Sequence, residues 1–122
     1  MLIPTQIKSF RQNFFPCLGG ILGGISVASH FWLIFMPISL FILWKGSERK
    51  IANFCWGFFF ILISHSWLYD LHPLTWLGFS WLVSLIITIL ILLFCAFWGG
   101  LLVYLWGLLV EILLWKEDFL KM

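Results

Sequence analysis

The sequence predicts an all-α integral membrane protein with about four transmembrane helices: a short N-terminal hairpin followed by one normal and one long helix. Of the 122 residues, 63% are apolar and only 10% are charged, whereas a soluble domain is about half apolar and about a quarter charged. A chain this short has too little interior to bury so many large apolar side chains away from water. Lipid must therefore act as the solvent, and residues 1–122 are expected to form a single multi-pass membrane domain.

Three apolar blocks, 14–44, 51–69 and 76–115, alternate with short polar segments that carry most of the charges. Block 51–69 would be about 28 Å long as an α-helix, close to the thickness of the hydrocarbon core. The other two blocks are compatible with either one or two crossings. The distribution of Lys and Arg therefore has to decide how many times each block crosses.

The positive charges favour four crossings with the N- and C-termini both in the cytoplasm. If block 14–44 crosses twice and block 76–115 once, all seven Lys and Arg residues lie on one side of the membrane. If the first block crosses once and the last twice, the same residues are split between the two sides. Because Lys and Arg are concentrated in cytoplasmic loops, the first arrangement is expected, with spans at roughly 15–30, 33–45, 51–69 and 78–112.

The expected spans differ in length. Each arm of the 14–44 hairpin has only about 13 to 15 residues, fewer than the ~20 of an ordinary span. Ser29, His30 and Pro37 mark where the helix breaks or restarts. The last span is longer than one crossing requires, so we expect it to tilt or to project into the cytoplasm, with Gly99-Gly100 as a place for a kink.

A glycine-rich segment lies in the first expected span and contains two overlapping GxxxG patterns. Glycines four residues apart form a flat helix face that the backbone of another helix can approach closely. We interpret this face as a helix-packing site, either inside the bundle or between two copies of the chain. A phosphate-binding loop is not expected, because no strand precedes the segment and no Lys-Ser or Lys-Thr pair follows it. The packing residues are Gly19, Gly20, Gly23 and Gly24.

A second candidate site is the segment SHSWLYDLHPLTW, residues 64–76, which contains no Lys or Arg. A zinc site built on His65, Asp70 and His72 would need His30 as a further ligand in good geometry. A proton relay would need an ionisable group in mid-membrane. The interpretation we favour over these two is an interfacial turn on the non-cytoplasmic side. Its aromatic side chains would lie at headgroup depth, and the residues that would meet the lipid surface are His65, Trp67, Tyr69, His72 and Trp76.

No catalytic, cofactor-binding or metal-binding residues are predicted. Cys17, Cys55 and Cys95 lie in apolar sequence without a CxxC spacing, and we interpret them as packing residues. Glu111 is expected at the cytoplasmic edge because Lys116 follows it closely. A net charge of +2 is too small to indicate nucleic acid as a partner, so membrane lipids are the expected ligands.

The order of these features resembles the membrane region of the apolipoprotein N-acyltransferase family. The third span of that family is similar to three stretches of this sequence: Arg49-Lys50-Ile51-Ala52, Phe54-Cys55-Trp56-Gly57-Phe58-Phe59-Phe60 and Ser66-Trp67-Leu68-Tyr69. The first hairpin of the family resembles the glycine-rich span, the turn His30-Phe31-Trp32 and Pro37. The resemblance covers roughly residues 16 to 110.

The resemblance implies that the chain is the N-terminal membrane segment of an acyltransferase-like protein in the bacterial inner membrane. Family members transfer an acyl group from a phospholipid to the N-terminal cysteine of a lipoprotein. A nitrilase-like domain supplies their catalytic Glu, Lys and Cys. None of the three cysteines matches that nucleophile, so the chain alone is expected to be inactive.

A separately encoded catalytic part or another membrane protein would then be the partner of this chain. In such an assembly Trp67, Tyr69 and Trp76 would lie near the lateral opening through which lipid acyl chains enter. The alternative is a small, non-enzymatic accessory subunit with four spans, held in a larger membrane complex through the Gly19–Gly24 face.

Overall fold

The computed structural model describes residues 3–46 and 49–120, and within them the side chains of residues 14–29, 32–46 and 49–113. All its regular elements are helical, and the described residues contain no strand, which confirms the all-α class. In chain order the elements are α1 (Ile3–Ala28), η1 (His30–Phe35), α2 (Met36–Gly46), α3 (Lys50–Ser64), η2 (Ser66–Leu71), η3 (Leu74–Leu77) and α4 (Trp81–Leu120). The three η elements are short 3₁₀-helices.

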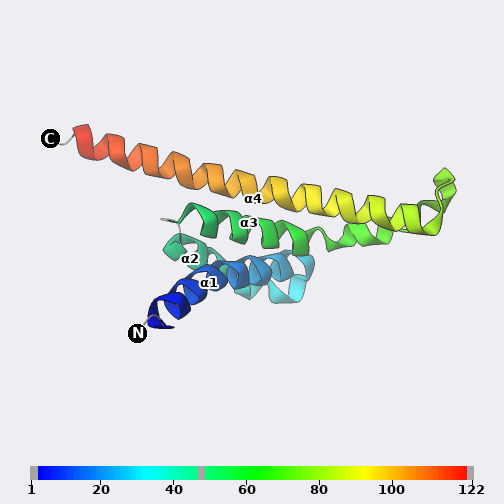
Figure 1. Cartoon of the computed structure of the whole chain (residues 1–122), viewed down its shortest axis with the longest axis horizontal. Helices are drawn as coiled ribbons and strands as arrows, with labels where there is room; N and C mark the ends of the chain where they lie inside the picture. Colours follow the sequence, from blue (N-terminus) through cyan, green and yellow to red (C-terminus); the bar gives the residue numbers. More distant parts are fainter. Residues whose placement is uncertain (1–2, 47–48, 121–122) are drawn as a thin grey trace.

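The helices form a bundle in which α3 is central. Helix α1 contacts both α2 and α3, and α4 runs along the other side of α3 (Figure 1). The start of α1, the end of α2, the start of α3 and the end of α4 lie toward one end of the bundle. We call it the basic end because Lys45, Arg49 and Lys50 are there. The segment 65–80 lies toward the other end, beyond the last turn of α1.

Among the described residues, one helical stretch is long and apolar enough to cross a membrane by length and composition. It is Trp81–Leu113 in α4, with 33 residues. The other apolar helical stretches are shorter: Phe14–Ala28, Trp32–Gly46 and Lys50–Ser64. An α-helix of about 15 residues is only ~22 Å long, which is less than the ~30 Å hydrocarbon core. The arrangement of four complete spans therefore stays a prediction.

The third expected span, 51–69, is not one continuous α-helix. Helix α3 ends at Ser64, and the chain continues through His65 into η2. The Ser64 hydroxyl donates to the Ile61 carbonyl (3.4 Å), and the Oγ of Ser64 lies 3.0 Å from the Nδ1 of His65. Such local side-chain bonds compete with the regular helical pattern, which gives a physical reason for the early end of the α-helix. A 3₁₀-helix rises about 2.0 Å per residue, so α3 and η2 together are still about 34 Å long.

Helix α4 also differs from its expected form. It begins at Trp81 rather than near residue 78, because Gly78 has a positive φ of 83°, a left-handed conformation that glycine adopts without a steric penalty. It then continues as one α-helix to Leu120, without a break at Gly99-Gly100. Forty residues make an α-helix about 60 Å long, twice the thickness of the hydrocarbon core.

The interior of the bundle is small and partly polar, whereas its surface is apolar. The buried polar side chains are Ser26, Ser39, Asn53, Ser64, Ser84 and Thr88. Large apolar side chains are exposed along every α-helix, for example Phe15 (60%) in α1, Trp44 (74%) in α2, Ile51 (69%) in α3 and Phe94 (69%) in α4. This distribution is typical of helices that pack through small residues while lipid covers the outside, and it supports a location in a membrane.

Candidate functional site

The four glycines of α1 lie buried where α1 meets α2 and α3. A Cβ atom added to Gly19 would come within 2.7 Å of Ile42 Cγ2, and one added to Gly24 within 2.6 Å of Ile63 Cβ. A Cβ on Gly20 would overlap the carbonyl oxygen of Trp56. Side chains larger than hydrogen therefore do not fit unless the helices move apart. Helices of the same chain occupy the Gly19–Gly24 face, so it is not available to a second copy or to another protein.

Two hydrogen bonds join the three helices at this face. The Ser39 hydroxyl donates to the carbonyl oxygen of Gly19 across 2.6 Å, and the indole Nε1 of Trp56 donates to the carbonyl oxygen of Ser39 across 3.2 Å. Serine hydroxyls commonly link helices where lipid cannot satisfy a polar group. Sequence analysis missed Ser39, although a lone serine in the apolar helix α2 is a signal that could have identified it.

A second set of glycines lies at the interface between α3 and α4. A Cβ on Gly57 would come within 2.7 Å of the Gly99 carbonyl oxygen, and one on Gly100 within 2.9 Å of the Phe54 carbonyl oxygen. A Cβ on Gly107 would overlap the side-chain amide of the buried Asn53. Gly99 and Gly100 thus allow close approach of two backbones rather than a kink in α4.

At the basic end, an ion pair connects α3 to α4. Lys50 Nζ lies 3.2 Å from Glu111 Oε2, and both side chains are about half exposed, at 45% and 54%. Sequence analysis placed Glu111 at the cytoplasmic edge because Lys116 follows it closely, and the side chain of Lys116 lies outside the described residues. The contact places Glu111 level with the first turn of α3.

The aromatic residues of segment 64–76 lie on the short 3₁₀-helices η2 and η3 and are exposed. The exposed fractions are 57% for Trp67, 48% for Tyr69 and 75% for Trp76. The His65 ring lies 6.4 Å from the Trp67 ring and bonds to its neighbour Ser64. His65 and Tyr69 are four residues apart, but they do not share an α-helical face because the α-helix ends at Ser64.

His72 is joined to the first turns of α4 rather than to His65. Its Nδ1 lies 2.8 Å from Ser84 Oγ, and the same oxygen accepts the backbone N–H of Leu74 across 2.7 Å. The His72 ring meets the Trp81 ring edge-on, with 5.0 Å between the ring centroids. His72 and Ser84 therefore fasten the turn to α4, which is a structural role that the sequence did not reveal.

The described residues contain no group of three His, Cys, Asp or Glu side chains that could hold a metal ion. The side chain of His30, the extra ligand considered for a metal site, lies outside the described residues. Cys17 and Cys55 contact each other across the interface of α1 and α3, and Cys95 lies on α4. All three cysteines are in the reduced form, without a disulfide bond.

Comparison with known proteins identifies relatives that share most of this chain. An apolipoprotein N-acyltransferase of Prochlorococcus marinus subsp. pastoris (strain CCMP1986 / NIES-2087 / MED4) is 65% identical over 121 residues, which are 99% of this chain and 24% of the relative. The protein of the same name from a second strain of Prochlorococcus marinus is 45% identical over 84% of this chain and 21% of the relative.

A more distant relative with that name, from Synechocystis sp. (strain ATCC 27184 / PCC 6803 / Kazusa), is 37% identical over 53% of this chain and 12% of the relative. No family model and no solved structure matches the chain. The chain spans about a quarter of the length of the first of these relatives. The comparisons confirm the resemblance that the sequence features indicated.

Proposed function

We propose that this chain forms the N-terminal transmembrane region of an apolipoprotein N-acyltransferase. The premise is that the chain is homologous to part of the proteins with that name. The observation that carries the proposal is the 65% identity over 99% of the chain, matched to only 24% of the relative. Identity at this level across the whole chain indicates that the helical bundle described above corresponds to one region of the longer protein.

In the proposed arrangement, the bundle lies in the bacterial inner membrane with four spans and both termini in the cytoplasm. The arrangement is supported by the position of Lys45, Arg49 and Lys50 at one end of the bundle and by the lack of Lys and Arg in segment 65–80 at the other. Lys and Arg favour the cytoplasmic side. The apolar surface of α4 supports contact with lipid or with further helices of a longer protein.

The proposed role of the bundle is to anchor the acyltransferase and to border the opening through which acyl chains reach it. The exposed aromatic side chains of Trp67, Tyr69 and Trp76 support such a border, because Trp and Tyr are favoured at headgroup depth. The acyl group would pass from a phospholipid to the N-terminal cysteine of a lipoprotein. The nitrilase-like domain of the family supplies the nucleophile, so this chain by itself should not catalyse the transfer.

Two complementation experiments test the proposal in a bacterial strain depleted of its own N-acyltransferase. The chain expressed alone should leave lipoprotein N-termini unacylated, as measured by mass spectrometry of the N-terminal peptides. A chimera in which the chain replaces the matching segment of the 65% identical relative should restore acylation. The unmodified relative is the positive control. Acylation by the chain alone, or an inactive chimera that reaches the membrane in normal amounts, would contradict the proposal.

The alternative of a non-enzymatic accessory subunit finds less support. It relied on the Gly19–Gly24 face as the surface that binds a larger complex. That face is buried against Ile42 of α2 and against Trp56 and Ile63 of α3. An accessory subunit would therefore have to bind through another surface, and the relatives that match the chain carry the name of an enzyme.

A further inference from the structure

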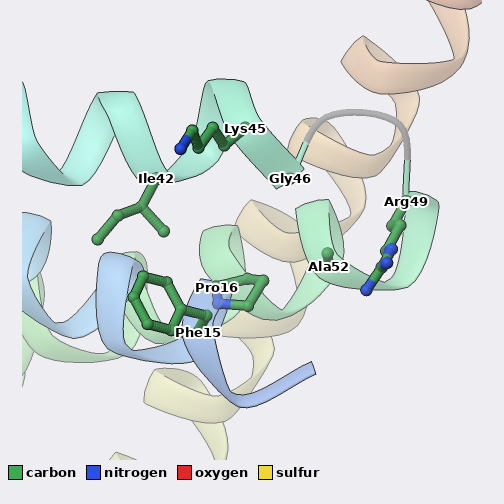
Figure 2. Close-up of a pocket in the computed structure, with 7 residues that line it drawn as sticks. All are labelled: Phe15, Pro16, Ile42, Lys45, Gly46, Arg49 and Ala52. Atoms are coloured by element: carbon green, nitrogen blue, oxygen red, sulfur yellow. The ribbon is translucent and has the colours of Figure 1, made fainter. Parts of the chain in front are cut away.

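A cavity of about 240 Å³ opens at the basic end of the bundle, where α1, α2 and the start of α3 meet. Its walls are apolar and are formed by Phe15, Pro16, Ile42 and Ala52. Lys45 on α2 and Arg49 at the start of α3 both line the cavity, and the Lys45 side chain extends along α2 away from Arg49 (Figure 2). The site thus combines an apolar floor with two positive charges.

The two cations of the cavity are available to an anion. Among the described side chains, no carboxylate lies within ion-pair distance of Lys45 or Arg49, whereas the neighbouring Lys50 is paired with Glu111 at 3.2 Å. Lys45 Nζ lies 5.2 Å from the centroid of the Phe41 ring, and Lys45 is an exposed residue. Glu48 follows Lys45 closely in the sequence, but it lies outside the described residues.

The cavity walls favour a ligand that is partly apolar. Phe15, Pro16, Ile42 and Ala52 make most of the cavity lining apolar, and Lys45 and Arg49 are its charged residues. A water-soluble anion would leave this floor in contact with water, which is unfavourable. A phospholipid would place its phosphate near the cations and its glycerol and first methylene groups against Phe15 and Ile42. Basic cavities between helices are typical binding sites for lipid headgroups.

We propose that this cavity binds the headgroup of an anionic membrane phospholipid, with the phosphate between Lys45 and Arg49. The bound lipid would join α1, α2 and α3 at the basic end, where Gly46 and Arg49 flank the junction of α2 and α3. The site lies at the opposite end of the bundle from Trp67, Tyr69 and Trp76, so it is separate from the proposed opening for the acyl donor. The proposal requires that the chain lies in a membrane, but it does not depend on acyltransferase function.

Native mass spectrometry of the whole 122-residue chain in detergent tests the site. The chain is titrated separately with phosphatidylglycerol, with phosphatidylcholine and with glycerol 3-phosphate. We expect phosphatidylglycerol to bind most tightly. Because juxtamembrane Lys and Arg side chains attract anionic lipid headgroups, the double variant K45Q/R49Q should weaken phosphatidylglycerol binding about tenfold or more. The matched control K116Q/K121Q removes the same charge near the C-terminus of the sequence, far along the chain from the cavity residues, and should change the affinity by less than about twofold.

Each other outcome would overturn the proposal. Equal weakening by K45Q/R49Q and K116Q/K121Q would indicate general charge attraction, and equal binding of phosphatidylcholine would remove the role of the anion. Binding of glycerol 3-phosphate as tightly as phosphatidylglycerol would assign the site to a soluble phosphate. If K45Q/R49Q loses helix content in circular dichroism, its lower affinity no longer tests the site, and a labelling experiment on the unaltered chain takes its place. A phosphatidylglycerol with a photoreactive group near its phosphate should then label residues at the cavity, and labelling confined to α4 would contradict the proposal.

Discussion

Lys50 Nζ and Glu111 Oε2 lie 3.2 Å apart, which joins the first turn of α3 to the late part of α4. The two residues are far apart in the sequence, so their contact reports the register of two antiparallel helices. An ion pair that is about half exposed stabilises a fold only slightly, by about 0–1 kcal/mol in water. The pair therefore defines how α4 is aligned on α3 more than it determines the overall stability.

Charge reversal tests this alignment. E111K should lower the free energy of unfolding by about 0.5–1 kcal/mol, because it places two cations side by side. The double variant K50E/E111K should recover most of that loss, since it restores the opposite charges at the same positions. Unfolding in mixed detergent micelles, followed by circular dichroism, measures both variants. A double variant no more stable than E111K would show that the two side chains are not neighbours.

Gly20 provides a test of the interface between α1 and α3. A Cβ atom at this position would overlap the carbonyl oxygen of Trp56, so G20A should force the helices apart. Overpacking of this kind lowers stability by about 1–3 kcal/mol. Gly46 is the matched control, because its added Cβ would lie 3.8 Å from Pro16 Cγ, an ordinary contact. Equal stability of G20A and G46A in the same unfolding assay would contradict the observed packing of α1.

Cross-linking of native thiols tests which helices are neighbours. Cys17 and Cys55 contact each other across the interface of α1 and α3, so a short thiol-bridging reagent such as dibromobimane should link them within one chain. Peptide mass spectrometry identifies the linked residues, and C95S should leave the yield unchanged. A product linked through Cys95, or a dimer linked through Cys17, would indicate a different arrangement.

Ser84 is expected to hold the turn at His72 and Leu74 onto α4. S84A removes the hydroxyl that bonds to His72 Nδ1 and accepts the N–H of Leu74. Loss of a buried hydrogen-bond partner lowers local stability by about 1–3 kcal/mol. The Leu74 amide should therefore exchange its hydrogen about tenfold faster or more, as measured by hydrogen–deuterium exchange. S80A alters an exposed serine one turn earlier and serves as the control, and equal exchange in S84A and S80A would exclude this role for Ser84.

Composition and hydropathy were sufficient to predict an all-helical chain whose surface is apolar. The expected third and last spans, 51–69 and 78–112, overlap closely with α3 plus η2 and with α4. Helix ends were predicted less well. Helix α3 ends early because of the side-chain contact between Ser64 and His65, and α4 begins late because of the backbone conformation of Gly78. An average of hydropathy over many residues does not detect such local effects.

The sequence by itself determined that the chain is helical, that it is too apolar to be solvated by water alone, and that small residues recur where helices can approach closely. Only the tertiary structure decided which surfaces meet: Gly20 against Trp56, Gly57 against Gly99 and Lys50 beside Glu111. The physical reason is that a GxxxG pattern describes one face of one helix. The partner of that face depends on the rotation, tilt and register of every helix at once.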